Sequence, residues 1–539
     1  MASKHLLFDS EAREKILNGA KALADAVRVT LGPKSKCVLI GRKWGRPLVC
    51  NDGVTIAKEL ELKDPDENLG AQMMREAAER TGDLVGDGTT TATVIAYAIL
   101  AEGIRNVAAG ASGIDLKRGL DAATKTAVET LRCISKPVAS RKEKAQVATI
   151  SAHNDAAIGE MVAEAMERVG LEGAITVEEA KGTSTTLDVV EGMQFDRGFL
   201  SAYFVTDPQK MEAVLDEPRI FLYDRKISSV KDLLPMLELA VNMHKSILLV
   251  AEDIDQDALA MLVVNKLRGA LQCAAVKAPG FGDRRKAMME DIAVLTGGQF
   301  FAEELGVNLE KITLENLGHA KRVILDKDNT TIIGGGGTPE AIAGRCADIR
   351  RQIEQSTSDY DKEKLRERLA KLSGGVAIIR VGAPSEAEMR SQKEAYDDAI
   401  SATKAAVAEG IVPGGGLALL RAIDAVEREA EKYSGDFKTG FFILRRALEA
   451  PVRQIALNSA ADGGVVVDRM RHGSGNMGFD AASGRYVDLI EEGIIDPTKV
   501  VRVALENAVS VAGTLLLAEA TMTETQEPKT ALPAETEAA

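Results

Sequence analysis

The segment Gly86–Thr91 combines the residue types of a phosphate-binding turn. Asp87 lies between two glycines, three threonines follow, and an apolar run begins at Ala92. Glycines let the backbone approach an anion closely, and the amides that open the following helix can bond to phosphate oxygens. Asp87 would supply a hard oxygen ligand for Mg²⁺, and the threonine hydroxyls can bond to phosphate or metal. The same residues also cap ordinary helices, so a nucleotide site and a plain helix start both stay open at this point.

The composition favours a large acidic protein with several domains. The chain has 539 residues, which exceeds one ordinary core and predicts about three or four domains. Hydrophobic residues make up 45% and aromatic residues 4%, which favours a helical or α/β protein rich in Ala, Val, Leu and Ile. The net charge of −14, without a long basic run, argues against nonspecific nucleic-acid binding. Neither a leader nor a membrane-spanning run is found, so a cytoplasmic location without membrane association is expected.

Other catalytic and nucleotide signatures are weak or missing. The five cysteines and five histidines are scattered, without a C-x-x-C pair or an H-E-x-x-H motif, and G-x-x-x-x-G-K-[ST] does not occur. Gly473–Gly478 matches G-x-G-x-x-G and follows the strand-like run Val465–Val467. The helix that a dinucleotide site needs is missing after it, so this motif predicts a loop or hairpin.

The N-terminal part is predicted to be mainly helical with polar turns. Helical periodicity over residues 10–29 stops at Thr30–Pro33, and Asn51–Gly53 is a hairpin-like turn signal after two short strands. A second helical region, over about 64–109, is interrupted at Gly86–Gly88. The turns are therefore expected to carry the polar residues, and the helices to hold them in place.

The middle of the chain has a different texture. From about 190 to 375, apolar runs at 220–223, 247–250 and 274–276 alternate with helical stretches, which predicts a separate α/β domain. Helical texture returns from 385 onward, and Gly414–Gly416 opens another apolar helix. If the two helical ends form one domain, the middle is an insertion.

Several motifs together resemble those of group I chaperonins, the GroEL family. The nucleotide-site motifs are Thr30–Pro33, Gly86–Thr91, Gly414–Gly416 and Asp496–Lys499. Two long and specific strings, Val190–Gly198 and Ala278–Lys286, extend the resemblance over nearly the whole chain.

The resemblance implies a GroEL-like multidomain fold of α and α/β type. A mainly helical equatorial ATP-binding domain would comprise residues 1–134 and 411–539, a small intermediate hinge domain 135–190 and 377–410, and an inserted α/β apical domain 191–376. It also implies self-association into seven-membered rings, two of them stacked. The activity implied is that of an ATP hydrolase coupled to protein folding.

By resemblance, the phosphates and Mg²⁺ lie among Thr30, Leu31, Gly32, Pro33, Asp87, Gly88, Thr89, Thr90 and Thr91. Asp87 is the expected metal ligand. Around the base and ribose the resemblance places Gly415, Asp480, Ala481, Ala482 and Asp496. Asp398 matches the carboxylate that positions the attacking water, and Asp52 a second carboxylate in hydrolysis. Phosphoryl transfer depends on charge neutralisation and an aligned nucleophile, which these residue types can provide.

The resemblance also implies an apolar surface on the apical domain. It would bind unfolded polypeptides and the lid cochaperonin of the GroES type, and folding would proceed in a ring cavity that this lid closes. The matching residues are Phe199, Tyr203, Phe204, Leu234, Leu237, Leu259, Val263 and Val264. From spacing alone, such residues are more often part of a core.

Some positions depart from the family pattern. Asn51 replaces the usual lysine, which removes a positive charge near the phosphates but keeps a backbone carbonyl for a monovalent cation such as K⁺. Asp480 stands where asparagine is common, and Ala460–Gly464 lacks one commonly acidic position of the ring-to-ring region. The tail Glu527–Ala539 lacks Gly-Gly-Met repeats.

Two other functions remain open from the residues. A small-molecule phosphotransferase would use the same phosphate turn but would need a specific acceptor. A binding protein that oligomerises without an effective ATP cycle would need none of the carboxylates, and the presence of Asp52, Asp87 and Asp398 argues against it.

Overall fold

The computed structural model describes residues 4–41, 47–170, 173–180, 182–208, 210–227, 234, 237–238, 240–241, 245–302, 312–356 and 358–524. The acidic tail Glu527–Ala539 lies outside them. The chain divides into two units: unit 1 is Met1–Ala163 with Glu394–Ala539, and unit 2 is Glu164–Lys393. The predicted insertion of a middle α/β part between two helical ends is thereby confirmed. The finer division into equatorial, intermediate and apical domains stays a prediction.

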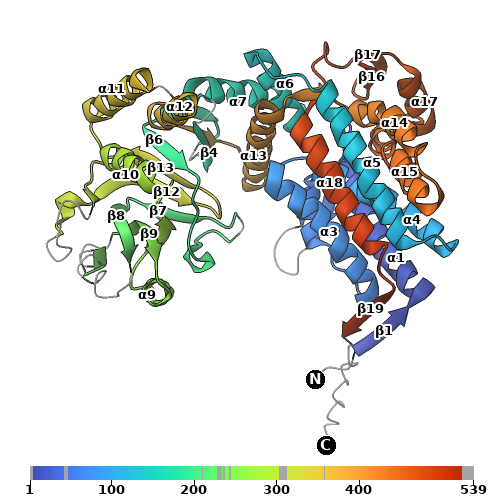
Figure 1. The fold of residues 1–539 in the computed structure, drawn as a ribbon, viewed down its shortest axis with the longest axis horizontal. Coiled ribbons are helices and arrows are strands. Elements are labelled where there is room, and N and C mark those ends of the chain that lie inside the picture. The colour runs from blue at the N-terminus through green and yellow to red at the C-terminus, as the bar shows by residue number, and fades with distance from the viewer. Residues whose placement is uncertain are drawn as a thin grey trace, which may run out of the picture. The chain divides into compact units, whose positions relative to one another are not determined.

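Unit 1 is built mainly from long helices (Figure 1). Its N-terminal segment contains β1 (Lys4–Phe8), α1 (Asp9–Val27), η1 (Arg28–Thr30), β2 (Val38–Ile40), β3 (Leu48–Cys50), α2 (Gly53–Glu59), α3 (Pro65–Val85), α4 (Thr89–Ala108), α5 (Gly113–Ile134) and α6 (Arg141–Ser151). Its C-terminal segment contains β15 (Ile411–Pro413), α14 (Leu417–Ala430), α15 (Gly435–Ala447), α16 (Ala450–Asn458), α17 (Gly463–His472), β16 (Met477–Asp480), β17 (Arg485–Asp488), β18 (Ile495–Pro497), α18 (Thr498–Leu515) and β19 (Ala520–Glu524). The chain crosses between the units within α7 (Ala156–Val169) and α13 (Glu386–Glu409).

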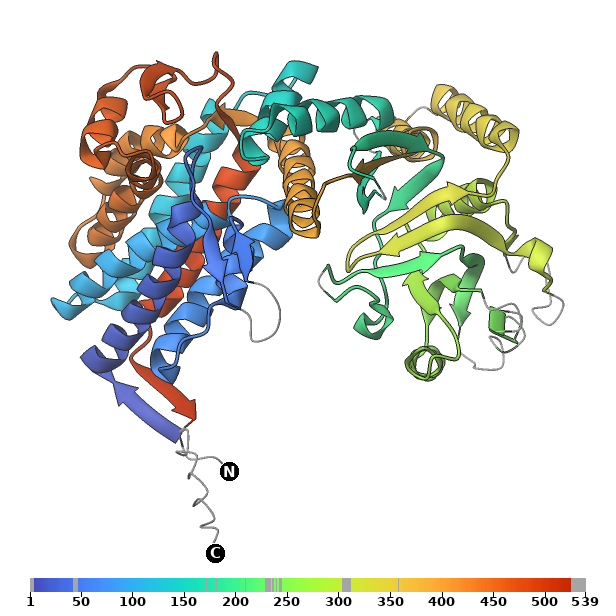
Figure 2. The same ribbon diagram turned by 180° about the vertical axis from the view of Figure 1, so that it is seen from behind.

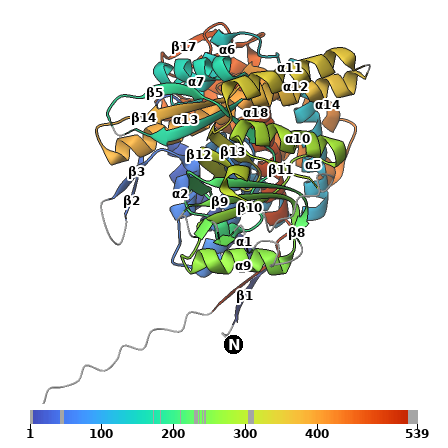
Figure 3. The ribbon, with the colours of Figure 1, turned by 90° about the vertical axis from the view of Figure 1, so that its left-hand side faces the viewer.

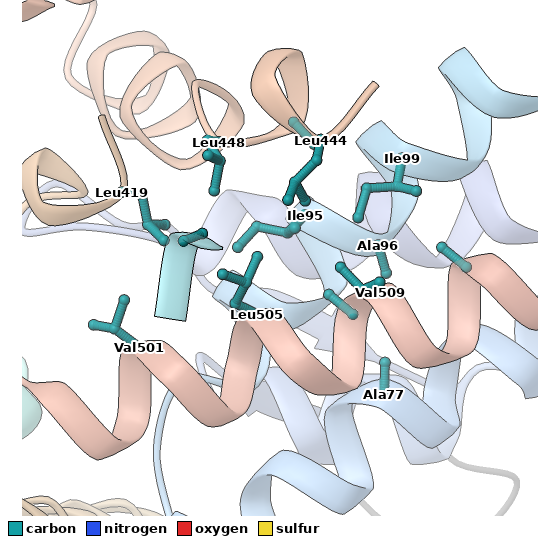
Figure 4. Packing of buried hydrophobic residues seen from close by; sticks show 14 of the residues in the cluster. Ala77, Ile95, Ala96, Ile99, Leu419, Leu444, Leu448, Val501, Leu505 and Val509 are labelled. Atoms are coloured by element: carbon teal, nitrogen blue, oxygen red, sulfur yellow. The ribbon is translucent and has the colours of Figure 1, made fainter. Parts of the chain in front are cut away.

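The core of unit 1 forms where helices from both chain segments meet. Leu505 and Val509 of α18 face Ile95 and Ile99 of α4, as Figure 4 shows, and all four side chains are buried. Each of these side chains contributes about 1.5–3 kcal/mol by leaving water. The packing therefore fixes the first turn of α4 relative to the C-terminal segment.

Short strand pairs close the ends of unit 1. β1 pairs with β19, β15 with β18 and β16 with β17, all antiparallel. β2 and β3 also pair, and they form a small hairpin at the edge of the unit (blue in Figure 2). The predicted turn Asn51–Gly53 is not the turn of this hairpin. Asp52 instead caps α2, because its carboxylate accepts hydrogen bonds from the amides of Val54 and Thr55.

Unit 2 is an α/β unit, as the alternation of apolar runs predicts. Its larger sheet has the order β10-β9-β8-β12-β13-β6, with β11 beside β8 and β7 beside β12, and its smaller sheet has the order β4-β14-β5. The strands are β4 (Ala174–Glu179), β5 (Thr186–Val190), β6 (Gly192–Phe195), β7 (Ala213–Asp216), β8 (Arg219–Ile227), β9 (Ile247–Ile254), β10 (Cys273–Lys277), β11 (Phe300–Phe301), β12 (Gly318–Leu325), β13 (Thr330–Gly335) and β14 (Val376–Val381).

Helices cover the larger sheet of unit 2 from different ends. α11 and α12 lie side by side, and α9 lies at the opposite end of the unit (Figures 1 and 3). Short 3-10 turns complete the unit, one of which carries Tyr203. The helices and turns are η2 (Ala202–Phe204), α9 (Gln256–Leu267), α10 (Gly282–Thr296), η5 (Leu314–Asn316), α11 (Pro339–Gln355) and α12 (Asp359–Ser373). Among the described helices of both units, none is long and apolar enough to cross a membrane.

Gly86 offers a test of how tightly the turn between α3 and α4 is packed. Its φ is +70°, and a Cβ there would collide with the side chain of Ser401 in α13. Gly484 has a similar φ of +75° but open space around it. We expect Gly484→Ala to lower the free energy of unfolding by about 1–2 kcal/mol through backbone strain alone. Gly86→Ala should cost about 1–3 kcal/mol more, because the clash adds to the strain.

Urea unfolding followed by circular dichroism measures both costs. Equal losses in the two variants would contradict the close packing of α13 on this turn.

Candidate functional site

Two glycines shape the turn that holds Asp87. Gly86 ends α3 and Gly88 begins α4, and both adopt the left-handed conformation with φ of +70° and +79°. L-residues with side chains rarely adopt this conformation, so the sequence Gly-Asp-Gly is required to end one helix and start the next within three residues. The amides of Thr89–Thr91 lie in the first turn of α4, where helices leave backbone N–H groups without intrahelical partners. The predicted helix start is confirmed, and it leaves donors for an anion.

Two other turns lie against the beginning of α4. The hydroxyl of Thr30 lies 3.0 Å from that of Thr90 and also donates to the carbonyl of Val27 at 2.9 Å. At Gly53, which opens α2, a Cβ would collide with the Thr90 hydroxyl. The structure thus brings together the predicted segments around Thr30, Asp52 and Thr90.

The segment Leu31–Pro33 is held from the C-terminal half of unit 1. Asn458, the last residue of α16, donates hydrogen bonds to the carbonyls of Arg28 at 2.9 Å and Leu31 at 2.8 Å. Gly32 has a φ of +91°, and its Cβ position lies 3.3 Å from Ile455 in the same helix. Sequence reasoning did not single out Asn458, because a single asparagine at a helix end is an ordinary cap.

Asp52 and Asp87 are close enough to Asp398 to raise its proton affinity. The pKa of Asp398 is raised well above its ordinary value, first by burial and then by Asp87 and Asp52. The pKa of Asp87 is also raised, chiefly by burial. Such a cluster of partly buried carboxylates favours either protonation or a bound cation, because like charges in a confined space repel.

Two residues that the sequence did not single out face Asp87. The hydroxyl of Ser151, at the end of α6, donates to Asp87 Oδ2 at 2.8 Å. His153 lies near enough to lower the pKa of Asp87, as does the hydroxyl of Ser151. The sequence gives no signal for either residue, since their contact with Asp87 arises only when α6 folds against the turn.

The positions predicted near the base and ribose lie on the paired strands of the C-terminal half or in the turns next to them. Asp496 in β18 pairs with Val412 in β15, and a Cβ on Gly414 would lie 3.0 Å from its carboxylate. Gly415, with a φ of +59°, has its Cβ position 3.9 Å from the carbonyl of Phe479 in β16. Asp480 ends this strand, and its carboxylate accepts from the Ala482 amide at 2.9 Å and from the Ser483 hydroxyl.

The predicted apical residues differ in exposure within unit 2. Tyr203 is 66% exposed, and Leu234 and Val264 are also exposed, whereas Phe199, Leu259 and Val263 are partly buried. Phe204 and Leu237 are buried in the core of the unit. The expectation of a displayed side chain is therefore wrong for these two residues in this conformation. Each of them has an exposed neighbour, Tyr203 or Leu234, because one side of its helical turn faces the core and the other side faces the solvent.

Metal ligands formed by the protein alone are not found in the described part of the chain. No group of three or more His, Cys, Asp or Glu residues there is arranged to hold a metal ion. A cation at Asp87 would therefore need further oxygen ligands from a nucleotide or from water, which is how Mg²⁺ commonly binds.

Asp496 gives a prediction for the pH dependence of stability. Burial, with a smaller effect of Asp87, raises its pKa to about 7. Below the pKa that Asp496 has in the unfolded chain, both states hold the proton, so this group does not change the free energy of unfolding. As the pH rises toward 7, the unfolded state releases this proton more readily than the folded state, so stability falls. Asp496→Asn removes this loss.

The midpoint of urea unfolding from pH 4 to pH 8 checks this prediction. The variant should gain stability relative to the wild type between about pH 4 and pH 7, and the difference should then stay constant. Asp488→Asn, in the neighbouring strand β17, serves as the control. A difference that does not change with pH would contradict the raised pKa of Asp496.

Comparisons with known proteins identify the family. The sequence pattern of the TCP-1/cpn60 chaperonin family matches residues 23–526. The chain is 66% identical over 529 residues to Chaperonin GroEL 5 of Bradyrhizobium diazoefficiens, and the match covers 98% of each protein. The resemblance inferred from the motifs is confirmed, as is the GroEL-like multidomain fold. The chain therefore belongs to the TCP-1/cpn60 chaperonin family as a GroEL-type, group I chaperonin that acts in ATP-dependent protein folding.

Proposed function

We propose that unit 1 binds ATP with Mg²⁺ at the turns around Asp87 and hydrolyses the nucleotide, and that unit 2 captures non-native polypeptides. The observation that carries the first part is the convergence of Asp52, Asp87 and Asp398 beside the first turn of α4. The exposed side chains near Tyr203 support the second part.

The phosphates would bind where the backbone and hydroxyl donors meet. The free amides of Thr89–Thr91 point along the axis of α4, and its dipole favours negative charge at this end. The hydroxyls of Thr30 and Thr90, 3.0 Å apart, can each turn to donate to a phosphate oxygen. Gly32 and Gly88, with φ of +91° and +79°, give the backbone the left-handed turns that border this position. The same residues thus provide both shape and donors.

The carboxylate cluster fits a bound cation. Like charges at Asp52, Asp87 and Asp398 oppose ionisation of the group, and a cation relieves that repulsion. Asp87 would be the protein ligand of Mg²⁺, with Oδ2 oriented by the hydroxyl of Ser151. When bound, Mg²⁺ neutralises the negative charge of the phosphates during transfer. Asn51, which precedes Asp52, has a backbone carbonyl that would suit K⁺.

Asp398 and Asp52 would have different roles in hydrolysis. The raised pKa of Asp398 makes it a better proton acceptor than an ordinary aspartate, so it would orient the attacking water and accept its proton. Asp52 is fixed by the hydrogen bonds from Val54 at 3.2 Å and Thr55 at 2.7 Å. It would therefore provide a stationary negative charge that orients the water or the cation.

The nucleoside would lie between the C-terminal turns. The Cβ position of Gly415 makes only ordinary contacts, at 3.9 Å, with Leu489 and Phe479, and Asp496 lies beside Gly414. A partly protonated Asp496 could either donate to or accept from a ribose hydroxyl. Asp480 would contact the base together with Ala481 and Ala482, although its carboxylate already bonds to its own turn.

The assembly and the cellular setting follow the family expectation. We propose seven-membered rings of this chain, two of them stacked, with a lid cochaperonin of the GroES type that closes the cavity. A ring repeats the apolar surface of unit 2, so several weak contacts hold one unfolded chain through avidity. We propose the cytoplasm as the compartment in which this cycle runs.

The role of Asp398 can be tested by its removal. We expect Asp398→Ala to bind ATP with nearly unchanged affinity and to hydrolyse it at least about 100-fold more slowly, because the base is lost while the phosphate donors remain. Isothermal titration calorimetry gives the affinity, and phosphate release gives the rate. Asp397→Ala, the neighbouring residue on the same helix, should stay within a few-fold of wild type. Near-normal hydrolysis by Asp398→Ala would reject the assignment.

The capture of unfolded protein by unit 2 has a separate test. Tyr203→Glu places a charge on the exposed apolar surface, so we expect it to abolish suppression of aggregation of a denatured protein, as light scattering measures. Tyr360→Glu, at an exposed tyrosine of α12, is the matched control and should suppress aggregation like the wild type. Unchanged suppression by Tyr203→Glu would remove Tyr203 from the docking surface.

A further inference from the structure

Lys266 makes an unusual contact for a surface lysine. It lies in the last turn of α9, and its ammonium group donates to the carbonyls of both Tyr203 and Val205 at 3.1 Å. These carbonyls lie on either side of Phe204, whose ring centroid is 6.0 Å from the same nitrogen. One side chain of α9 thus binds two backbone carbonyls of the turn η2 and its C-terminal end.

The segment that Lys266 holds is also attached at its other end, and the buried ring of Phe204 anchors it to the core of unit 2. The amide of Leu200 donates to the carbonyl of Ala275 in β10 at 2.9 Å, and Phe199 forms an isolated bridge with Val276. Within η2, the amides of Phe204 and Val205 bond to the carbonyls of Ser201 and Ala202. Lys266 therefore links the C-terminal end of this turn to α9 through two hydrogen bonds.

The orientation of Lys266 also affects the surface beside it. Val264 and Leu267 of α9 are 42% and 66% exposed, and Tyr203 is 66% exposed. A lysine among such residues usually extends its ammonium group into water. Here the group is partly buried against backbone carbonyls, and this burial lowers its pKa. The ammonium group is thus bound to the carbonyls of the turn, while these apolar side chains are exposed.

We propose that Lys266 is a positioning residue of the polypeptide-docking surface, which fixes η2 on α9 and so sets the position of the exposed side chain of Tyr203. The proposal rests on the proposed capture of non-native polypeptides by this surface. Lys266 acts through Tyr203 and need not touch the bound polypeptide.

A double-mutant cycle tests whether Lys266 acts through Tyr203. The probe is reduced, carboxymethylated α-lactalbumin with a fluorescent label, and its anisotropy gives the affinity for the full-length assembled protein without nucleotide. We expect Lys266→Met to weaken binding about five-fold, because coupled neighbours in contact typically show effects of this order. Lys266→Arg, which keeps the donors, should restore wild-type affinity. In the Tyr203→Ala background, Lys266→Met should have no further effect.

Hydrogen exchange followed by mass spectrometry measures directly how well the backbone amides of the turn are protected. Lys266→Met should speed exchange in residues 199–206, and Lys266→Arg should not. Lys226→Met is the matched control, because Lys226 pairs with Asp255 just before α9 and not with a residue of η2. If Lys266→Met does not assemble, Lys266→Gln replaces it in the same cycle, since its shorter stem removes the reach to both carbonyls.

The outcomes separate this proposal from the function on which it rests. Wild-type affinity in Tyr203→Ala would overturn the docking surface itself, and the proposal with it. Weakened binding in Tyr203→Ala together with an additive effect of Lys266→Met would overturn the positioning role alone. Unchanged exchange in residues 199–206 of Lys266→Met would also overturn it.

Discussion

The mutual repulsion of three carboxylates is the constraint on which the site in unit 1 depends. Asp52, Asp87 and Asp398 come from a helix cap, a glycine turn and the long helix α13, and beyond the effect of burial the first two raise the pKa of Asp398. Folding alone gains nothing from such a cluster, because partly buried like charges oppose it. A bound cation would relieve the repulsion, so the carboxylate cluster favours cation binding. Residues at functional sites often carry perturbed pKa values for this reason.

The rest of unit 1 supplies the rigidity that keeps these carboxylates together. α18 and α4 pack through buried Leu505, Val509, Ile95 and Ile99, so the start of α4 is fixed by the C-terminal half of the chain. α13 approaches the same start closely enough that only glycine fits at position 86. A displacement of α13 would therefore affect the positions of Asp87 and Asp398 together. A nucleotide bound as proposed at this turn would thereby be coupled to movement of α13.

Unit 2 solves a different problem, because it must expose apolar side chains and still remain folded. Phe204 and Leu237 are buried in its core, while Tyr203 and Leu234, on the same short segments, are exposed. The exposed residues are held by backbone contacts, such as those from Lys266 to the turn η2, and not by burial of their own side chains. The surface can thus stay apolar at little cost to the fold. A chaperone that must bind many sequences weakly is well served by this arrangement.

The sequence by itself determined the helices on either side of Gly86–Gly88, the α/β texture of the middle and the family. Those features depend on the spacing of nearby residues and on long motifs, both of which consist of residues close together in the sequence. Local patterns failed where a distant contact or a cap outweighed them. Asn51–Gly53 resembles a hairpin turn but starts α2, since Asp52 bonds to the amides that follow. Val465–Val467 resembles a strand but lies in α17, which Asp462 caps in the same way. Only the tertiary structure decided that Ser151 and Asn458 bond to turns of the site in unit 1 and that Lys266 bonds to the turn η2. The burial of Phe204 was likewise decided only there. Those roles arise from contacts between segments far apart in the chain, which no local pattern records.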